Sequence, residues 1–100
     1  MIDPVVLNRA VIRFLGFGTS VCPTEDAKAL DEEFDRETAT ALELEVKKLL
    51  DELSGLKPDW TRLSLVSAGA WAKDQMRNRH PELDRHTLDA LEWVFTWWWR

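Results

Sequence analysis

Histidine and acidic side chains gather around one proline, and this segment comes nearest to a metal site in the sequence. His80 and His86 lie on either side of Pro81, with Glu82 and Asp84 between them. Two ligands on one face of a helix are three or four residues apart, whereas a proline turn separates these histidines. Asp84 is also placed to cap the next helix. We expect no metal at this turn, where exposed histidines account for the pattern.

Cys22 is the one cysteine of the sequence, so an internal disulfide is excluded. A cysteine nucleophile needs a cation that lowers its pKa and a base within reach, and residues 19–23 contain neither. We expect either a small buried side chain or a thiol near the start of the following helix. Residues 16–18 form no phosphate loop, because they follow a helix and lack a third glycine. The sequence identifies no catalytic residue, no cofactor-binding residue and no cofactor.

Tryptophan is the most unusual feature of the composition. There are six tryptophans and no tyrosine, and four of the six lie in residues 93–100. Successive residues on a helix are about 100° apart, so the three consecutive indoles of residues 97–99 cannot all face one core. We expect Phe95 and Trp98 to be buried on the inner face. Trp97 or Trp99 should then be exposed and available to a partner, unless the tail only caps the helices with its indoles lying flat over them.

Acidic residues are concentrated in one part of the chain. Residues 24–53 hold eleven acidic and four basic residues, a net charge of −7, and the rest has a net charge of +2. A negative face of this kind attracts a basic partner. The candidate contact residues on it are Glu32, Glu33, Asp35 and Glu37. The alternative is a solvated helix face whose acids match the helix dipole near helix starts.

The overall charge argues against a nucleic-acid partner. The net charge is −5, whereas nucleic-acid binders usually carry clustered, uncompensated lysines and arginines. The basic residues near the proline turn are interleaved with acids; they are Lys73, Arg77, Arg79 and Arg85. The apolar stretches are too short to span a bilayer, and the first residues lack the basic region of a secretory signal. We expect a cytoplasmic protein that binds neither nucleic acid nor membrane.

Helix signals along the chain predict the elements that position these side chains. Asp3 before Pro4 marks a helix start, and Asp59 and Asp84 are placed to cap two later helices. We predict an all-α, single-domain bundle of four or five helices over residues 1–100. The helices are expected near residues 4–15, 24–35, 38–54, 60–79 and 85–97. The second and third are favoured as two helices rather than one bent helix, and the fourth should be central because both its sides are apolar.

These observations rank two functional classes. The first is a non-enzymatic binding or regulatory protein, such as an adapter, an inhibitor or an immunity-type protein. It would present its acidic face and its tryptophan-rich last helix to a protein partner, with a basic protein and a second copy of the chain both left open. The alternative is a small enzyme or ligand binder with an interhelical pocket near Cys22 or His80.

Overall fold

A side chain caps the start of each helix in the computed structural model, which describes residues 2–100. In every case an aspartate or serine oxygen accepts a hydrogen bond from a backbone N–H of the first turn. These caps begin α1 (Pro4–Leu15), α2 (Ala27–Glu33), α3 (Arg36–Ser54), α4 (Leu65–Arg79) and α5 (Arg85–Trp98). Residues 2–100 contain no strand. The protein is an all-α bundle, as predicted, and Asp3 and Asp84 cap the helices that were expected of them.

Two separate helices cover the acidic segment. Phe34 is extended, and Asp35 starts α3 by accepting a hydrogen bond from the backbone N–H of Thr38 at 2.7 Å. The first of these helices begins at Ala27 instead of the predicted residue 24. Thr24 is held by α1 instead, since its hydroxyl donates to the carbonyl oxygen of Phe14 at 2.8 Å. Its backbone N–H also donates to the carbonyl of Leu15 at 2.9 Å.

The predicted start of the fourth helix is wrong. Asp59 does not cap a helix at residue 60, because its carboxylate accepts a hydrogen bond from the backbone N–H of Thr61 at 3.1 Å and closes a turn. A local side-chain hydrogen bond of this kind competes with helix formation. The helix begins only at Leu65, where Ser64 accepts from the N–H of Ser67 at 3.1 Å.

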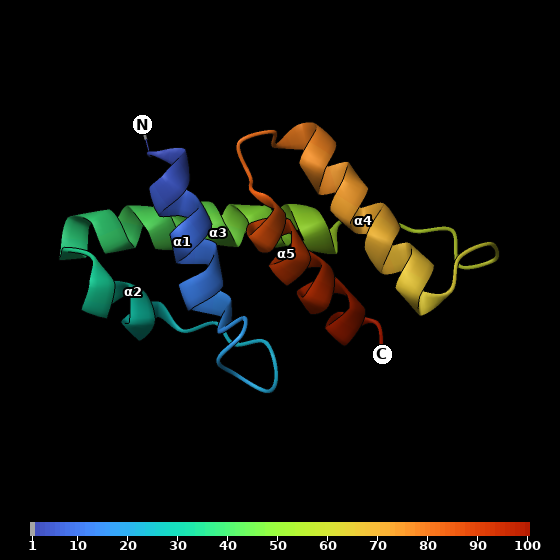
Figure 1. Ribbon diagram of the computed structural model, residues 1–100, viewed down its shortest axis with the longest axis horizontal. Helices are drawn as coiled ribbons and strands as arrows, with labels where there is room; N and C mark the ends of the chain where they lie inside the picture. Colours follow the sequence, from blue (N-terminus) through green and yellow to red (C-terminus); the bar gives the residue numbers. More distant parts are fainter. Residues whose placement is uncertain (1) are drawn as a thin grey trace.

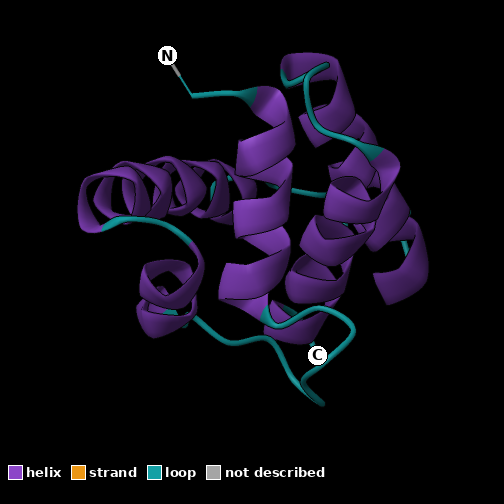
Figure 2. Cartoon of the chain, turned by 60° about the vertical axis from the view of Figure 1, so that its left-hand side comes forward, coloured by secondary structure: helices purple, strands orange, loops and turns teal. Residues whose placement is uncertain are grey.

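The helices pack around α1 and α5. Figure 1 shows α5 between α1 and α4, and Figure 2 shows α1 crossing α3 with α2 beside it. The core side chains come mainly from the inner faces of α1, α3 and α5. Consequently the prediction that the fourth helix is central is also wrong: α4 packs chiefly on α5, and Val66 on its outer side is 77% exposed.

Small residues bring α4 close to α5. Ala68, Gly69 and Ala72 are buried in this contact. A Cβ atom added at Gly69 would lie 2.6 Å from the Cγ2 atom of Thr96, closer than carbon atoms can approach. The glycine therefore sets the distance between the two helices.

Candidate functional site

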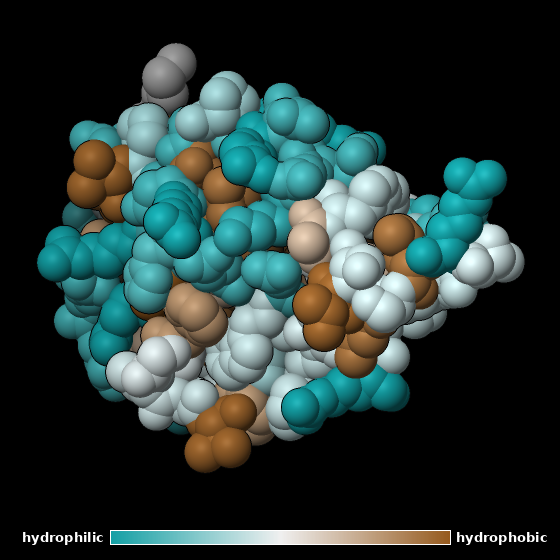
Figure 3. All heavy atoms as spheres, turned by 45° about the vertical axis from the view of Figure 1, so that its right-hand side comes forward, coloured by the Kyte–Doolittle hydropathy of each residue, from teal (hydrophilic) through white to brown (hydrophobic). Residues whose placement is uncertain are grey.

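The exposed aromatic side chains meet at the end of α5. Trp97, Trp98 and Trp99 lie there, and Trp60 joins them from the loop between α3 and α4. The ring centroids of Trp60 and Trp99 are 5.3 Å apart, and the four indoles are 39–47% exposed. We call these four tryptophans the aromatic end. Figure 3 shows brown and pale atoms side by side on the right, towards the α3–α4 loop, and further brown and pale atoms among the teal ones on the left and along the lower edge.

The expectation that Trp98 is buried is wrong. Phe95 is fully buried as predicted, but the indole of Trp98 is 43% exposed. Trp98 borders a hollow that Leu15, the last residue of α1, and Val94 also line, so this part of α5 lies at an open edge of the core. Trp97 and Trp99 are also exposed, in agreement with the requirement that at least one of them face outwards.

A groove of about 300 Å³ borders Trp97 and Trp98. It lies between α5, the end of α3 and the segment before α2. Buried apolar side chains form its floor, and polar side chains stand at its edge. The floor is made by Leu15, Leu50 and Val94, and the edge by Thr24, Glu25, Asp51 and Ser54. We call this hollow the aromatic groove.

A cation already lies over one indole of the aromatic end. The guanidinium carbon of Arg100 is 4.7 Å from the ring centroid of Trp97. At this distance the negative face of the indole attracts a positive charge. The indole of Trp97 therefore sits in a geometry that accepts a guanidinium group.

The four acidic residues proposed as partner contacts lie at the junction of α2 and α3, at the end of the molecule away from the C-terminus (Figure 1). Glu33 pairs with Arg9 at 2.8 Å, and Glu32 and Glu33 both lie within 3.6 Å of Arg13. These pairs tie α2 to α1. The structure does not bring these acids together with the tryptophans.

The other two acids of this set stand at the start of α3. Asp35 caps the helix, and the hydrogen bonds from the backbone N–H and side chain of Thr38 lower the pKa of its carboxyl group. Glu37 is exposed in the first helical turn. Thus three of the four candidate acids already have intramolecular partners.

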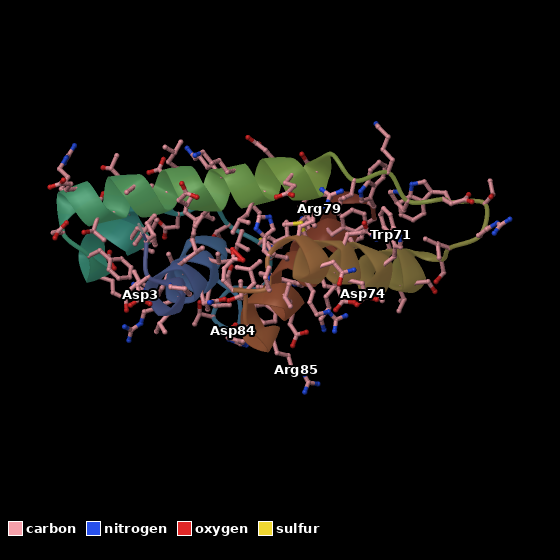
Figure 4. The ribbon with its side chains drawn as sticks, turned by 90° about the horizontal axis from the view of Figure 1, so that it is seen from above. Asp3, Trp71, Asp74, Arg79, Asp84 and Arg85 are labelled. Carbon is pink, nitrogen blue, oxygen red and sulfur yellow. The ribbon has the colours of Figure 1, made fainter. Side chains whose placement is uncertain are left out.

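The histidines of the proline turn have different surroundings. The Nε2 atom of His80 lies 2.6 Å from the Oε2 atom of Glu52, and the other carboxylate oxygen, Oε1, accepts a hydrogen bond from Arg79 at 3.2 Å. Figure 4 shows the side chain of Arg79 between α4 and α3. His86 instead contacts Phe17 with the two rings tilted by 50° and their centroids 5.2 Å apart. Within residues 2–100, no three His, Cys, Asp or Glu side chains are arranged to hold a metal ion.

Cys22 and His80, the residues expected near an interhelical pocket, do not line the aromatic groove. Cys22 is exposed in the loop before α2, so the expectation of a buried thiol is wrong, and α2 begins five residues later, at Ala27. A hollow of about 510 Å³ near the proline turn lies between α1 and the start of α5 and includes His86 but not His80. Its main polar side chains are already engaged, since Asn8 is hydrogen-bonded and Arg9 is ion-paired.

Most basic residues near the proline turn also have acidic partners. Lys73 pairs with Asp89, Arg77 with Asp74 and Arg79 with Glu52. Arg85 points away from the protein in Figure 4. This segment therefore presents no uncompensated basic patch of the kind that phosphate backbones need. Within the described part of the chain, no helix has the length and apolar character that crossing a membrane requires.

Comparison with known proteins found no matching family model, no matching curated protein and no matching solved structure.

The sequence alone did not indicate three residues of the aromatic end and the aromatic groove. Trp60 was expected inside a helix, and Glu25 and Asp51 carried no signal of their own. Asp51 was one of many acids on a helix, and Glu25 reaches the groove only because α1 holds the neighbouring Thr24.

Proposed function

We propose that the protein is a non-enzymatic binding protein that contacts a protein partner through its aromatic end. The observation that carries this proposal is the exposure of four indoles, each 39–47% exposed, at the end of α5 and on the α3–α4 loop that contacts it through Trp60 and Trp99. Soluble monomers rarely expose a contiguous apolar patch without a role for it, and tryptophan is enriched in protein interfaces and their energetic centres. An adapter, an inhibitor or an immunity-type protein would use such a surface.

The acidic segment has a different part in this proposal. Glu32, Glu33 and Asp35 are held by internal contacts, so we assign them attraction at a distance and not direct recognition. A net charge of −7 over residues 24–53 attracts a basic partner and raises the rate of encounter at low salt. The aromatic end then supplies the close contact.

Removal of two exposed indoles tests the proposal. The double variant Trp97→Ala, Trp99→Ala is compared with the wild type in affinity capture from the native lysate, with the bound proteins quantified. Leu44→Ala is the matched control, because Leu44 is 57% exposed on α3, outside the aromatic end. Circular dichroism checks that all three proteins are folded, and sedimentation equilibrium measures self-association.

The expected result is a captured protein, or self-association, that the double variant loses and the control keeps. A change of about ten-fold or more is expected if the indoles are energetic centres of the interface. A wild-type protein that is monomeric and captures nothing dependent on Trp97 and Trp99 would contradict the proposal.

A further inference from the structure

The charged side chains at the edge of the aromatic groove are both negative. Glu25 and Asp51 are both exposed, stand on different segments, and make no ion pair within residues 2–100. Two cations lie near the groove: Arg100, whose guanidinium lies over Trp97, and Lys47, one turn before Asp51 on α3, whose amino group is bound to Glu43 at 2.8 Å. The hydrogen bond and charge of Glu43 raise the pKa of Lys47, and the charges of Glu25 and Asp51 add to this effect. Both groove carboxylates thus act on Lys47, and the three acids Glu25, Glu43 and Asp51 exceed the two cations Lys47 and Arg100 by one negative charge.

The walls of the groove suit the apolar part of a basic side chain. Arginine and lysine carry their charge at the end of an apolar stem, which packs on indoles while the head group reaches a carboxylate. Trp97 and Trp98 supply the indoles, and Leu50 and Val94 supply an apolar floor. The contact of Arg100 with Trp97 is an example of this chemistry within the chain itself.

We propose that the aromatic groove binds a basic side chain from a segment of the protein partner, with its stem on Trp97 and Trp98 and its charge at Glu25 and Asp51. This inference rests on the proposed function and names the chemistry of the partner. The groove, at about 300 Å³, is at the small end of ligand sites and takes one or two side chains, not a folded element. Charge complementarity therefore selects a segment that contains arginine or lysine next to apolar residues.

A pair of peptides tests this recognition. The basic probe is acetyl-Leu-Arg-Leu-Arg-Leu-amide, and the matched probe replaces both arginines with citrulline, which keeps the shape and removes the charge. Binding is followed by the NMR signals of the indole N–H groups, which report each tryptophan separately. We expect saturable shifts of the Trp97 and Trp98 signals with the basic peptide, and an affinity at least about five-fold weaker for the citrulline peptide.

Two charge variants with the same change in net charge provide the control. Glu25→Gln, Asp51→Asn removes the groove carboxylates, and we expect it to weaken binding of the basic peptide by about five-fold or more. Asp31→Asn, Glu82→Gln removes two exposed acids outside the groove and outside the candidate partner contacts, and should change the affinity less than two-fold. Equal binding of the two peptides, equal effects of the two variants, or no shift of these signals at 5 mM peptide would overturn the inference.

The proposed function and this inference fail separately. If lysate capture depends on Trp97 and Trp99 but is unchanged in Glu25→Gln, Asp51→Asn, the aromatic end binds a partner without using the acidic edge of the groove. In that case only the inference is overturned.

Discussion

Asn8 is the polar side chain through which α1 holds the turn between α4 and α5. It is buried, and its amide group donates to the carbonyl oxygens of Pro4 at 2.7 Å and Glu82 at 3.0 Å. Its carbonyl oxygen accepts from the backbone N–H of Asp84 at 2.8 Å. One residue on α1 thus positions the cap of α5, the helix that carries the aromatic end.

Substitution of Asn8 should therefore lower the free energy of unfolding more than substitution of an exposed polar residue does. We expect Asn8→Ala to lower the free energy of unfolding by about 1–3 kcal/mol, because it leaves buried backbone groups without partners. Urea denaturation measures this, with Asn78→Ala on the exposed side of α4 as the control. Equal stability of the two variants would contradict the role of Asn8.

Glu52 should contribute to the pH dependence of stability. Partial burial raises the pKa of its carboxyl group, but the hydrogen bonds and charges of His80 and Arg79 outweigh this and the net pKa is lowered. A lowered pKa means that the contribution is present above the unfolded value near 4.5 and is lost as the pH falls through the folded value.

The measurement is the free energy of unfolding of wild type and Glu52→Gln from pH 7 to pH 3. We expect the wild type to be the more stable at pH 7 and the difference to shrink below about pH 4.5. A difference that stays constant over this range would show that the carboxylate charge is not what stabilises the contact.

At the scale of elements, the close contact between α4 and α5 depends on Gly69, which has no Cβ atom. The approach at Gly69 leaves 2.6 Å between an added Cβ atom and the Cγ2 atom of Thr96. Helix propensity alone would make alanine about 1 kcal/mol better than glycine at this position. Overpacking costs typically 1–3 kcal/mol, so the clash should win.

We expect Gly69→Ala to lower the free energy of unfolding by up to about 2 kcal/mol. Adding Thr96→Ser, which removes the clashing methyl group and keeps the hydroxyl that donates to Trp93, should recover most of the loss. A double-mutant cycle in urea measures the coupling. A Gly69→Ala variant more stable than the wild type would show that the helices separate at little cost.

The last turns of α5 combine a folding role with a surface role. Phe95 is fully buried, so Phe95→Ala should cost about 3–5 kcal/mol of stability. Trp98 is 43% exposed, and Trp98→Ala should cost roughly half as much or less. Thermal or urea unfolding of both variants decides this, and equal losses would place Trp98 in the core.

At the scale of the whole molecule, stability is unevenly distributed. α5 is covered by neighbours on two sides, whereas α4 packs chiefly on α5 and is tied to α3 by the contacts of Glu52 with Arg79 and His80. An element with fewer packed neighbours opens at a lower free energy. Most of the aromatic end therefore belongs to α5, which has more packed neighbours than α4.

Hydrogen exchange should reveal this difference. We expect the backbone amides of Ala72 and Met76 on α4 to exchange at least about ten-fold faster than those of Leu91 and Val94 on α5. Native-state exchange followed by NMR measures both sets in one sample. Equal protection of the two helices would mean that the molecule opens only as a unit.

Local signals in the sequence determined where most helices form. Asp3 and Asp84 cap helices within three residues of themselves, and Phe34 and Asp35 interrupt the acidic segment by their own backbone conformation. Such hydrogen bonds join near neighbours, so a pattern of residue types predicts them. Local signals failed at Thr24, whose hydroxyl binds α1, and at Asp59, whose carboxylate closes a turn with Thr61 instead of capping a helix.

Only the tertiary structure decided which surfaces are free. Trp98 lies on the face that the helical period assigns to the core, yet it is exposed at a hollow that it shares with Leu15, the last residue of α1. Glu25 and Asp51 are far apart in the sequence and meet across the aromatic groove because α1 holds the loop before α2. Whether a side chain is buried depends on where the neighbouring helix ends. The spacing of apolar residues within one helix does not predict the length of another helix.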